Sequence, residues 1–289
     1  MKSSLKITFI ALAMSVSMSA FAQDAIALKR TYTNGAVEKY TLTSNVTTST
    51  DLSSMGQDVM EMVVDSTSDL TLTYSNPKED GTVSLKFLLS NMVVKMAGPM
   101  AEMMSGGQEM PKELGGTAKL DALYQVSDVK VDGGGGGAMA IMTGGMSPIS
   151  IFQFFALPKD PVKVGDTWNF ELKGMEMFEK NYKMTAKLVG EAKVQEIDAW
   201  QINVSGSPKM NLDLSKMMSE GGGGAGMGDM KMMLEGTTKT LTKVFLSKAT
   251  GQIVMIDSAY ESTAEVKLPD MGVSFPSNSQ GISKLVIKK

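Results

Sequence analysis

The chain has 289 residues, a formal net charge of −3 and no cysteine or histidine, whereas methionine occurs 27 times. The mildly acidic balance argues against nucleic acid as a partner. The missing side chains exclude disulfide bonds, Ser-His-Asp and Cys-His catalytic groups, and zinc sites of the usual kind. No cofactor is predicted.

The first segment has the pattern of an export signal. Lys2 and Lys6 flank the start of an apolar run that reaches Val16, and an A-x-A motif ends at Ala22, before Gln23. The run is too short to cross a bilayer. We therefore expect residues 1–22 to be removed and the remainder to be soluble in the periplasm or outside the cell.

The next stretch predicts β-strands. Tyr40 and Leu42 alternate with polar residues after the turn at Gly35, and residues 69–74 repeat the alternation. A strong turn signal at 76–81 then leads into a strand that begins at Val83. Threonine-rich segments with an apolar residue at every second position favour strands over helices.

Four methionine-containing stretches instead carry helical spacing, at 55–64, 96–104, 212–218 and 230–234. Their apolar residues recur at i, i+3, i+4 and i+7, which is typical of an amphipathic helix. Two glycine tracts, at 133–137 and 221–228, predict loops. Between them, residues 148–155 are apolar and predict one helical turn beneath the core.

A second series of strands begins after Leu157. Gly165 precedes an alternating run of Trp168, Phe170 and Leu172, and strands are expected at 167–173, 182–189, 192–196 and 200–205. The strands 238–246 and 253–265 follow, joined by a turn that contains Gly251. Aligning Gly35 with Gly165 and Gly81 with Gly251 suggests that the chain repeats itself.

The expected fold is mainly β. It consists of curved antiparallel sheets in two similar halves, as a half-barrel or a sandwich, with short Met-rich helices and Gly-rich loops. The expected divisions are a signal peptide (1–22), an N-terminal β half (23–132), a linker with a short apolar segment (133–156) and a C-terminal β half (157–289).

The segments 158–170, 193–205 and 246–256 carry a resemblance. The first, with its P-x-x-P-V-x-V-G-D-x-W pattern, resembles the strand opening of exported bacterial proteins that belong to a domain-of-unknown-function family. The other two segments are similar to the same family, and strand patterns of periplasmic lipoprotein carriers and related lipid-binding proteins are similar as well. The carrier resemblance implies a curved half-barrel with a hydrophobic cavity, and the family resemblance implies no activity.

Methionine thioethers are soft ligands that suit Cu(I). Two groups have the spacing for such a site: Met100, Met103 and Met104, and Met227, Met230, Met232 and Met233. The same spacing fits helices that pack on a sheet, either as plain core or as a lining for an apolar ligand. The metal site is the weakest of these interpretations.

Other polar residues have ordinary structural explanations. Asp166 is expected to accept backbone N–H bonds in its turn. Arg30 is the only arginine and so the only residue that could form a fork-shaped clamp on phosphate or carboxylate. The pair Glu176 and Glu179 lacks surroundings that would favour acid–base catalysis.

Taken together, these patterns predict a non-enzyme, with no catalytic residues. The first hypothesis is a periplasmic binding or carrier module for a hydrophobic ligand such as a lipid or a lipoprotein. The alternatives are an envelope structural or interaction protein without a small ligand, and a Met-based Cu(I) binder. The expected partners are therefore a hydrophobic small molecule, a lipid or an envelope protein, and the chain is not expected to span a membrane.

Overall fold

The computed structural model describes residues 24–99, 101, 113–132, 150–171, 178, 182–213, 215 and 231–288. The N-terminal strands in this part are β1 (Val37–Asp51), β2 (Val59–Ser75), β3 (Val83–Ala97), β4 (Leu114–Leu120) and β5 (Val126–Val131). The C-terminal strands are β6 (Thr167–Glu171), β7 (Lys183–Val194), β8 (Ile197–Gly206), β9 (Lys209–Asp213), β10 (Met233–Ser247), β11 (Ile253–Leu268) and β12 (Val273–Ile287). The 3₁₀ turns are η1 (Ser53–Met55), η3 (Ser150–Phe152) and η4 (Pro269–Met271).

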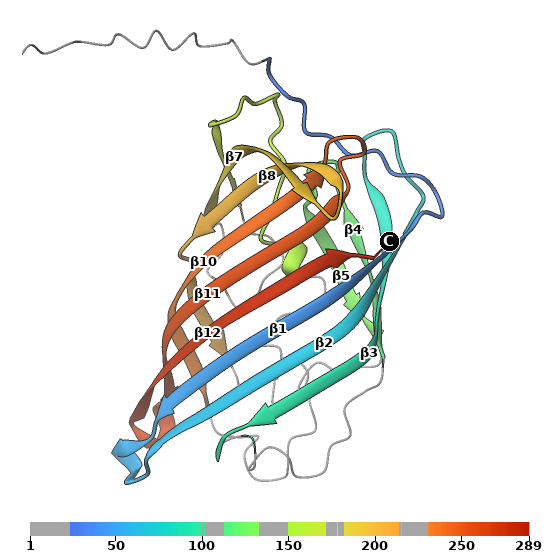
Figure 1. Cartoon of the computed structure of the whole chain (residues 1–289). Helices are drawn as coiled ribbons and strands as arrows, with labels where there is room; N and C mark the ends of the chain where they lie inside the picture. The colour runs from blue at the N-terminus through green and yellow to red at the C-terminus, as the bar shows by residue number, and fades with distance from the viewer. Residues whose placement is uncertain are drawn as a thin grey trace, which may run out of the picture.

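These strands form one open antiparallel sheet in the order β5-β4-β3-β2-β1-β12-β11-β10-β8-β7-β6, with β9 on the free part of β10. The sheet curves around its own interior (Figure 1). The first and last strands meet in its middle, where β1 pairs with β12 from Tyr40↔Ile287 to Thr50↔Ser277. The expected curved antiparallel β fold is confirmed, and both parts of the chain contribute to a single sheet.

Several turns form where the sequence predicts them. Gly35 and Gly165 both have positive φ, at 79° and 98°, in the turns before β1 and β6. The turn between β7 and β8 lies earlier than expected: Gln195 and Glu196, which the sequence placed in a strand, adopt φ of 47° and 69°, as a two-residue hairpin turn of the primed type requires. The proposed duplication and the division into halves stay predictions.

The helical prediction for the methionine stretches is wrong where their residues join strands, although Pro99, Ala101 and Ser215 are helical and Met55 ends η1. Residues 59–64 belong to β2, Leu212 belongs to β9, and Met233 and Leu234 begin β10. Met60, Met62 and Val64 also alternate with period two, and β1 pairs with β2 from Val59 to Thr73. The local sequence fits both a helical and a two-residue strand periodicity, so the long-range pairing with β1 determines that this segment is a strand.

The core lies on the inner face of the sheet, at the end nearer η3. Tyr40, Leu70 and Leu285 are 0% exposed there. The apolar segment from Phe152 to Leu157 packs against them, and the Phe152 and Tyr40 rings lie 6.4 Å apart. The expected helical turn beneath the core is therefore present, as η3.

Candidate functional site

The inner face of the sheet changes character along its strands. At one level the cross-strand neighbours on β10, β11, β12 and β1 are Val244, Ile256, Leu285 and Leu42. One level further from the core, the neighbours are Thr242, Ser258, Ser283, Ser44 and, on β2, Ser66. An apolar row and a row of hydroxyl groups thus lie side by side on one face.

More hydroxyl groups continue this surface toward the far end of the strands. Thr238, Ser262, Ser279 and Thr48 are cross-strand neighbours on β10, β11, β12 and β1. With the members between and beside them they form what we call the hydroxyl belt: Ser44, Thr48, Thr50, Ser66, Thr238, Thr240, Thr242, Ser258, Tyr260, Ser262, Ser277, Ser279 and Ser283. Alternation places all of them on the same face as Tyr40 and Leu285.

Within the belt, hydroxyls bond to one another across the strands. The Thr242 and Ser258 oxygens are 2.7 Å apart, and Thr238 donates to Ser262 over 3.2 Å. Thr240 Oγ1 is buried and has no hydrogen-bond partner in the described part of the chain. Thr238, Thr240, Thr242 and Ser262 are buried, whereas the half-buried hydroxyls of the belt can still donate or accept, so that part of the belt is a surface able to bind polar groups.

Tyr260 is the one large side chain of the belt. A Cβ atom at Gly281, its neighbour on β12, would overlap the Tyr260 ring, so the ring lies against the bare backbone of that glycine. Burial raises the pKa of the Tyr260 phenol. Apart from this ring, the belt consists of short side chains, which hold the surface close to the backbone.

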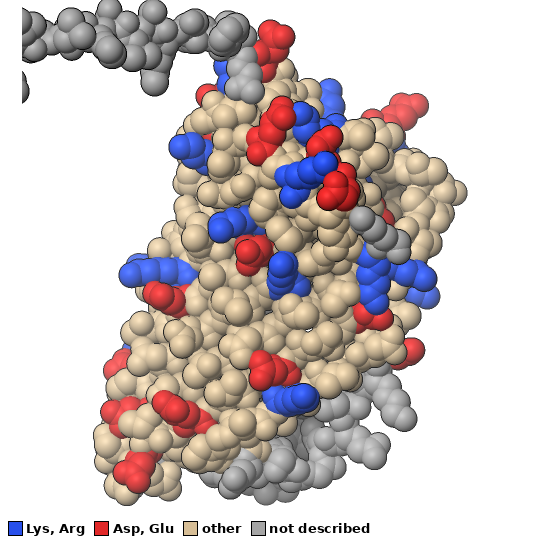
Figure 2. All heavy atoms as spheres, viewed as in Figure 1, with Lys and Arg blue, Asp and Glu red and all other residues tan. Residues whose placement is uncertain are grey.

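Charged side chains on the same strands point the other way. In β1, β2, β3, β10, β11 and β12 only Glu38 falls on the inner face. The outer face carries Lys39, Asp51, Glu61, Asp65, Asp69, Lys86, Lys95, Glu235, Lys239, Lys243, Asp257, Glu261, Glu265, Lys267 and Lys284. Figure 2 shows acidic and basic groups interspersed on the face that these strands turn to solvent.

Glu38 belongs to a buried polar cluster that also contains Arg30. The two side chains form an ion pair, and each is 6% exposed. Tyr40 and Tyr74 donate hydrogen bonds to the second carboxylate oxygen over 2.7 and 2.8 Å. The only arginine is therefore engaged inside the protein, so it is not free to serve as an external phosphate or carboxylate clamp.

Aromatic rings enclose the Arg30 guanidinium. Its carbon lies 4.8 Å from the Tyr32 ring centre, 4.9 Å from that of Tyr74 and 5.5 Å from that of Tyr124. The Tyr124 hydroxyl also donates to the Gly251 carbonyl over 3.0 Å. This cluster ties the N-terminal arm, β1, β2 and two turns together, so its role is structural.

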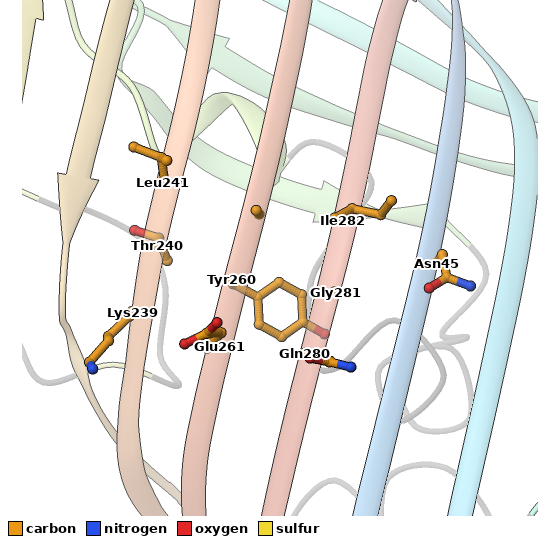
Figure 3. Close-up of a pocket in the computed structure, with 10 residues that line it drawn as sticks. Asn45, Lys239, Thr240, Leu241, Tyr260, Glu261, Gln280, Gly281 and Ile282 are labelled. Carbon is orange, nitrogen blue, oxygen red and sulfur yellow. The ribbon is translucent and has the colours of Figure 1, made fainter.

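The outer face has a hollow of about 460 Å³ over β10, β11 and β12. Leu241 and Ile282 border it, and they are 49% and 60% exposed. Figure 3 shows these two side chains with Lys239, Glu261 and Gln280 around it. None of its ten lining residues is a methionine, so this hollow differs from the Met-lined cavity that the sequence suggested.

Of the candidate copper ligands, Met100, Met103, Met104, Met227 and Met230 lie outside the described residues, as do the cleavage residues Ala22 and Gln23. Met233 begins β10 opposite Lys267, and the Met232 amide donates to the Ser215 hydroxyl over 2.8 Å. The Cu(I) site therefore stays a prediction. Among the described residues there is no cluster of three or more Asp, Glu, His or Cys that could hold a metal ion.

Two further sequence predictions can be placed. Asp166 accepts a hydrogen bond from the Lys163 amide over 2.8 Å, which confirms its role in the turn. The Trp168 indole donates to the Ala156 carbonyl over 2.9 Å and packs against the core.

Glu176 and Glu179 lie outside the described residues. In the part of the chain that the structure describes, no helix has the length and apolarity needed to cross a membrane.

No protein-family model matches the chain, and no curated protein matches it either. Among solved structures, the chain is similar to lipovitellin, in a study of lipid–protein interactions, with a TM-score of 0.46 and 11% identity. That match covers 90% of this chain but 26% of the lipovitellin chain. A DUF1329 family protein from Desulfovibrio piger matches with a TM-score of 0.16 and 13% identity, over 86% of this chain and 84% of that one. Neither likeness is close enough to indicate a shared function.

Proposed function

We propose that this chain is an exported, non-catalytic binding module that holds an amphiphilic molecule, such as a lipid, against the inner face of its sheet. Leu42 and Val46, the half-buried apolar residues on the inner face of β1, would contact the hydrocarbon part. The neighbouring hydroxyl belt would bind the polar part. Export rests on the signal pattern of residues 1–22.

The hydroxyl belt is the observation that carries this proposal. The covered face of an antiparallel sheet normally bears apolar side chains, because burying a hydroxyl group without a partner costs free energy. Here short hydroxyl side chains occupy that face across consecutive strands from β10 to β2. A polar surface beside an apolar one suits a molecule that has both kinds of group.

The non-catalytic part of the proposal rests on side-chain chemistry. The sequence contains no histidine or cysteine. The buried ionisable groups Arg30 and Glu38 are paired with each other. On the inner face of the described central strands, the hydroxyls of the belt have no neighbouring base to activate them.

The test is to recover what the protein carries. The full chain is exported in a bacterial host, purified without detergent and extracted with organic solvent, and the extract is analysed by mass spectrometry. We expect an amphiphile in near-stoichiometric amount. A Ser44→Trp variant, which fills the belt, should lose it, whereas Thr43→Trp on the opposite face should retain it.

Two results would contradict the proposal. The first is an extract of the native protein that contains no more amphiphile than a mock purification. The second is equal recovery from the Ser44→Trp and Thr43→Trp variants after both are shown to be folded by circular dichroism.

A further inference from the structure

The separation of charge between the two faces of the sheet limits what the inner face can bind. The outer face of the central strands carries many acidic and basic groups (Figure 2), and the inner face of the same strands carries only Glu38. The belt itself is made of serine, threonine and one tyrosine. A bound molecule would therefore meet hydroxyl groups and no fixed charge from these strands.

Glu38 does not supply an accessible charge to the belt. Its carboxylate is bonded to Arg30, Tyr40 and Tyr74, and its side chain is 6% exposed. On the inner face of β1, Tyr40 and Leu42 lie between Glu38 and the belt, which begins at Ser44. The positive and negative charges of the cluster also cancel each other.

A carboxylate, phosphate or ammonium group loses much of its hydration when it enters a half-buried site. That loss is recovered only where an opposite charge or several directed hydrogen bonds replace the water. Hydroxyl groups donate one bond and accept others, so they pair equally well with alcohols, ester carbonyls and ethers. The belt therefore fits an uncharged polar group better than an ionic one.

Resting on the proposed function, we infer that the ligand is a neutral amphiphile, in which hydroxyl or ester groups are attached to a hydrocarbon chain. Acylglycerols and uncharged glycolipids belong to this class. Ionised fatty acids, alkyl amines and phospholipids with a net charge do not. The half-buried hydroxyls of this row, from Ser258, Ser283, Ser44 and Ser66, contact the polar group.

Three probes with the same hydrocarbon chain test this inference: monoolein, which is neutral, oleate, which is anionic, and oleylamine, which is cationic. Each is titrated into the delipidated full-length protein at pH 8, below its aggregation concentration, by displacement of a fluorescent monoacylglycerol. Monoolein should bind at least tenfold more tightly than either ion. Equal or tighter binding of an ion overturns the neutral class and leaves the proposed function intact. If none of the three binds, the proposed function fails, and this inference with it.

A charge variant gives an independent readout. Ser44→Lys places a cation in the belt and should shift the ratio of oleate to monoolein affinity toward oleate by at least tenfold. Thr43→Lys adds the same charge on the outer face and should leave the ratio unchanged. An identical ratio in both folded variants overturns the inference. If Ser44→Lys does not fold, the comparison of the three probes on the native chain still tests whether the ligand is neutral.

Discussion

The hydroxyl oxygens of Thr242 and Ser258 lie 2.7 Å apart, and the two residues face each other across β10 and β11 on the inner face of the sheet. Thr242 is 1% exposed, directly beside the apolar row that begins with Val244. Thr242 and Ser258 therefore lie where the apolar core ends and the hydroxyl belt begins.

Thr242→Val should destabilise the protein, because it removes one member of this hydrogen-bonded pair without changing the side-chain volume much. We expect the free energy of unfolding to fall by about 1 kcal/mol, measured by urea denaturation. The matched variant is Thr240→Val on the same strand and face. Its buried hydroxyl has no partner among the described residues, so this substitution should raise the unfolding free energy by about 1 kcal/mol. Equal effects of the two variants would show that the two hydroxyls do not differ in hydrogen bonding.

Glu38→Gln should lower the free energy of unfolding far more than Thr242→Val does. It removes the negative partner of a buried guanidinium, and breaking a buried pair in this way costs about 3–5 kcal/mol of unfolding free energy. The exposed pair of Lys119 and Asp128 provides the control, because Asp128→Asn should change stability little. A Glu38→Gln protein with native stability in urea would show that the cluster is not a structural centre.

The buried tyrosines predict a loss of stability at high pH. Burial raises the pKa of Tyr40, Tyr74 and Tyr124, and the Glu38 carboxylate adds to the effect at Tyr40. Since these phenols ionise more readily in the unfolded chain, their contribution is fully present below the unfolded pKa of about 10 and is lost as the pH rises above it.

Tyrosinate absorbance at 295 nm should therefore rise together with the loss of the far-ultraviolet circular dichroism signal. The sequence contains six tyrosines, and four of them (Tyr32, Tyr40, Tyr74 and Tyr124) belong to this cluster, so most of the signal reports on it. A smooth titration of all six near pH 10 in a protein that keeps its circular dichroism would contradict the burial argument.

Gly281→Ala should destabilise the sheet through Tyr260, whose ring occupies the space that the new methyl group needs. Overpacking of this kind costs about 1–3 kcal/mol of unfolding free energy. Adding Tyr260→Leu should restore much of the loss, since the smaller side chain leaves room. A thermodynamic cycle of the two substitutions measures the coupling, and additive effects would count against the contact.

The sequence allowed the sheet to be predicted more fully than the binding surface. Alternation around Tyr40 and Leu42 and the turn at Gly81 correctly placed strands and a hairpin, because period-two patterns and turn chemistry are local signals. The length of β2 was misjudged because Val59, Met62 and Val63 fit a helical spacing while Met60, Met62 and Val64 fit an extended one, and only pairing with β1 resolves the choice.

The hydroxyl belt could not be predicted from local patterns at all. Strand β1 carries hydroxyl residues on both faces, so Ser44 and Thr43 look equivalent in the sequence. The two faces become distinct only when the register of β1 with β12 sets Ser44 opposite Ser283. That pairing joins residues 239 positions apart, and no short window contains it.

The central claim is that the inner face of the sheet binds an amphiphile, and fluorescence titration of two tryptophan variants tests it most directly. Ser283→Trp fills the hydroxyl row, and Lys284→Trp places the same ring on the outer face of the same strand. With a fluorescent monoacylglycerol as probe, we predict at least tenfold weaker binding for Ser283→Trp and native affinity for Lys284→Trp. Native affinity in a folded Ser283→Trp protein, or a loss confined to Lys284→Trp, would contradict the claim.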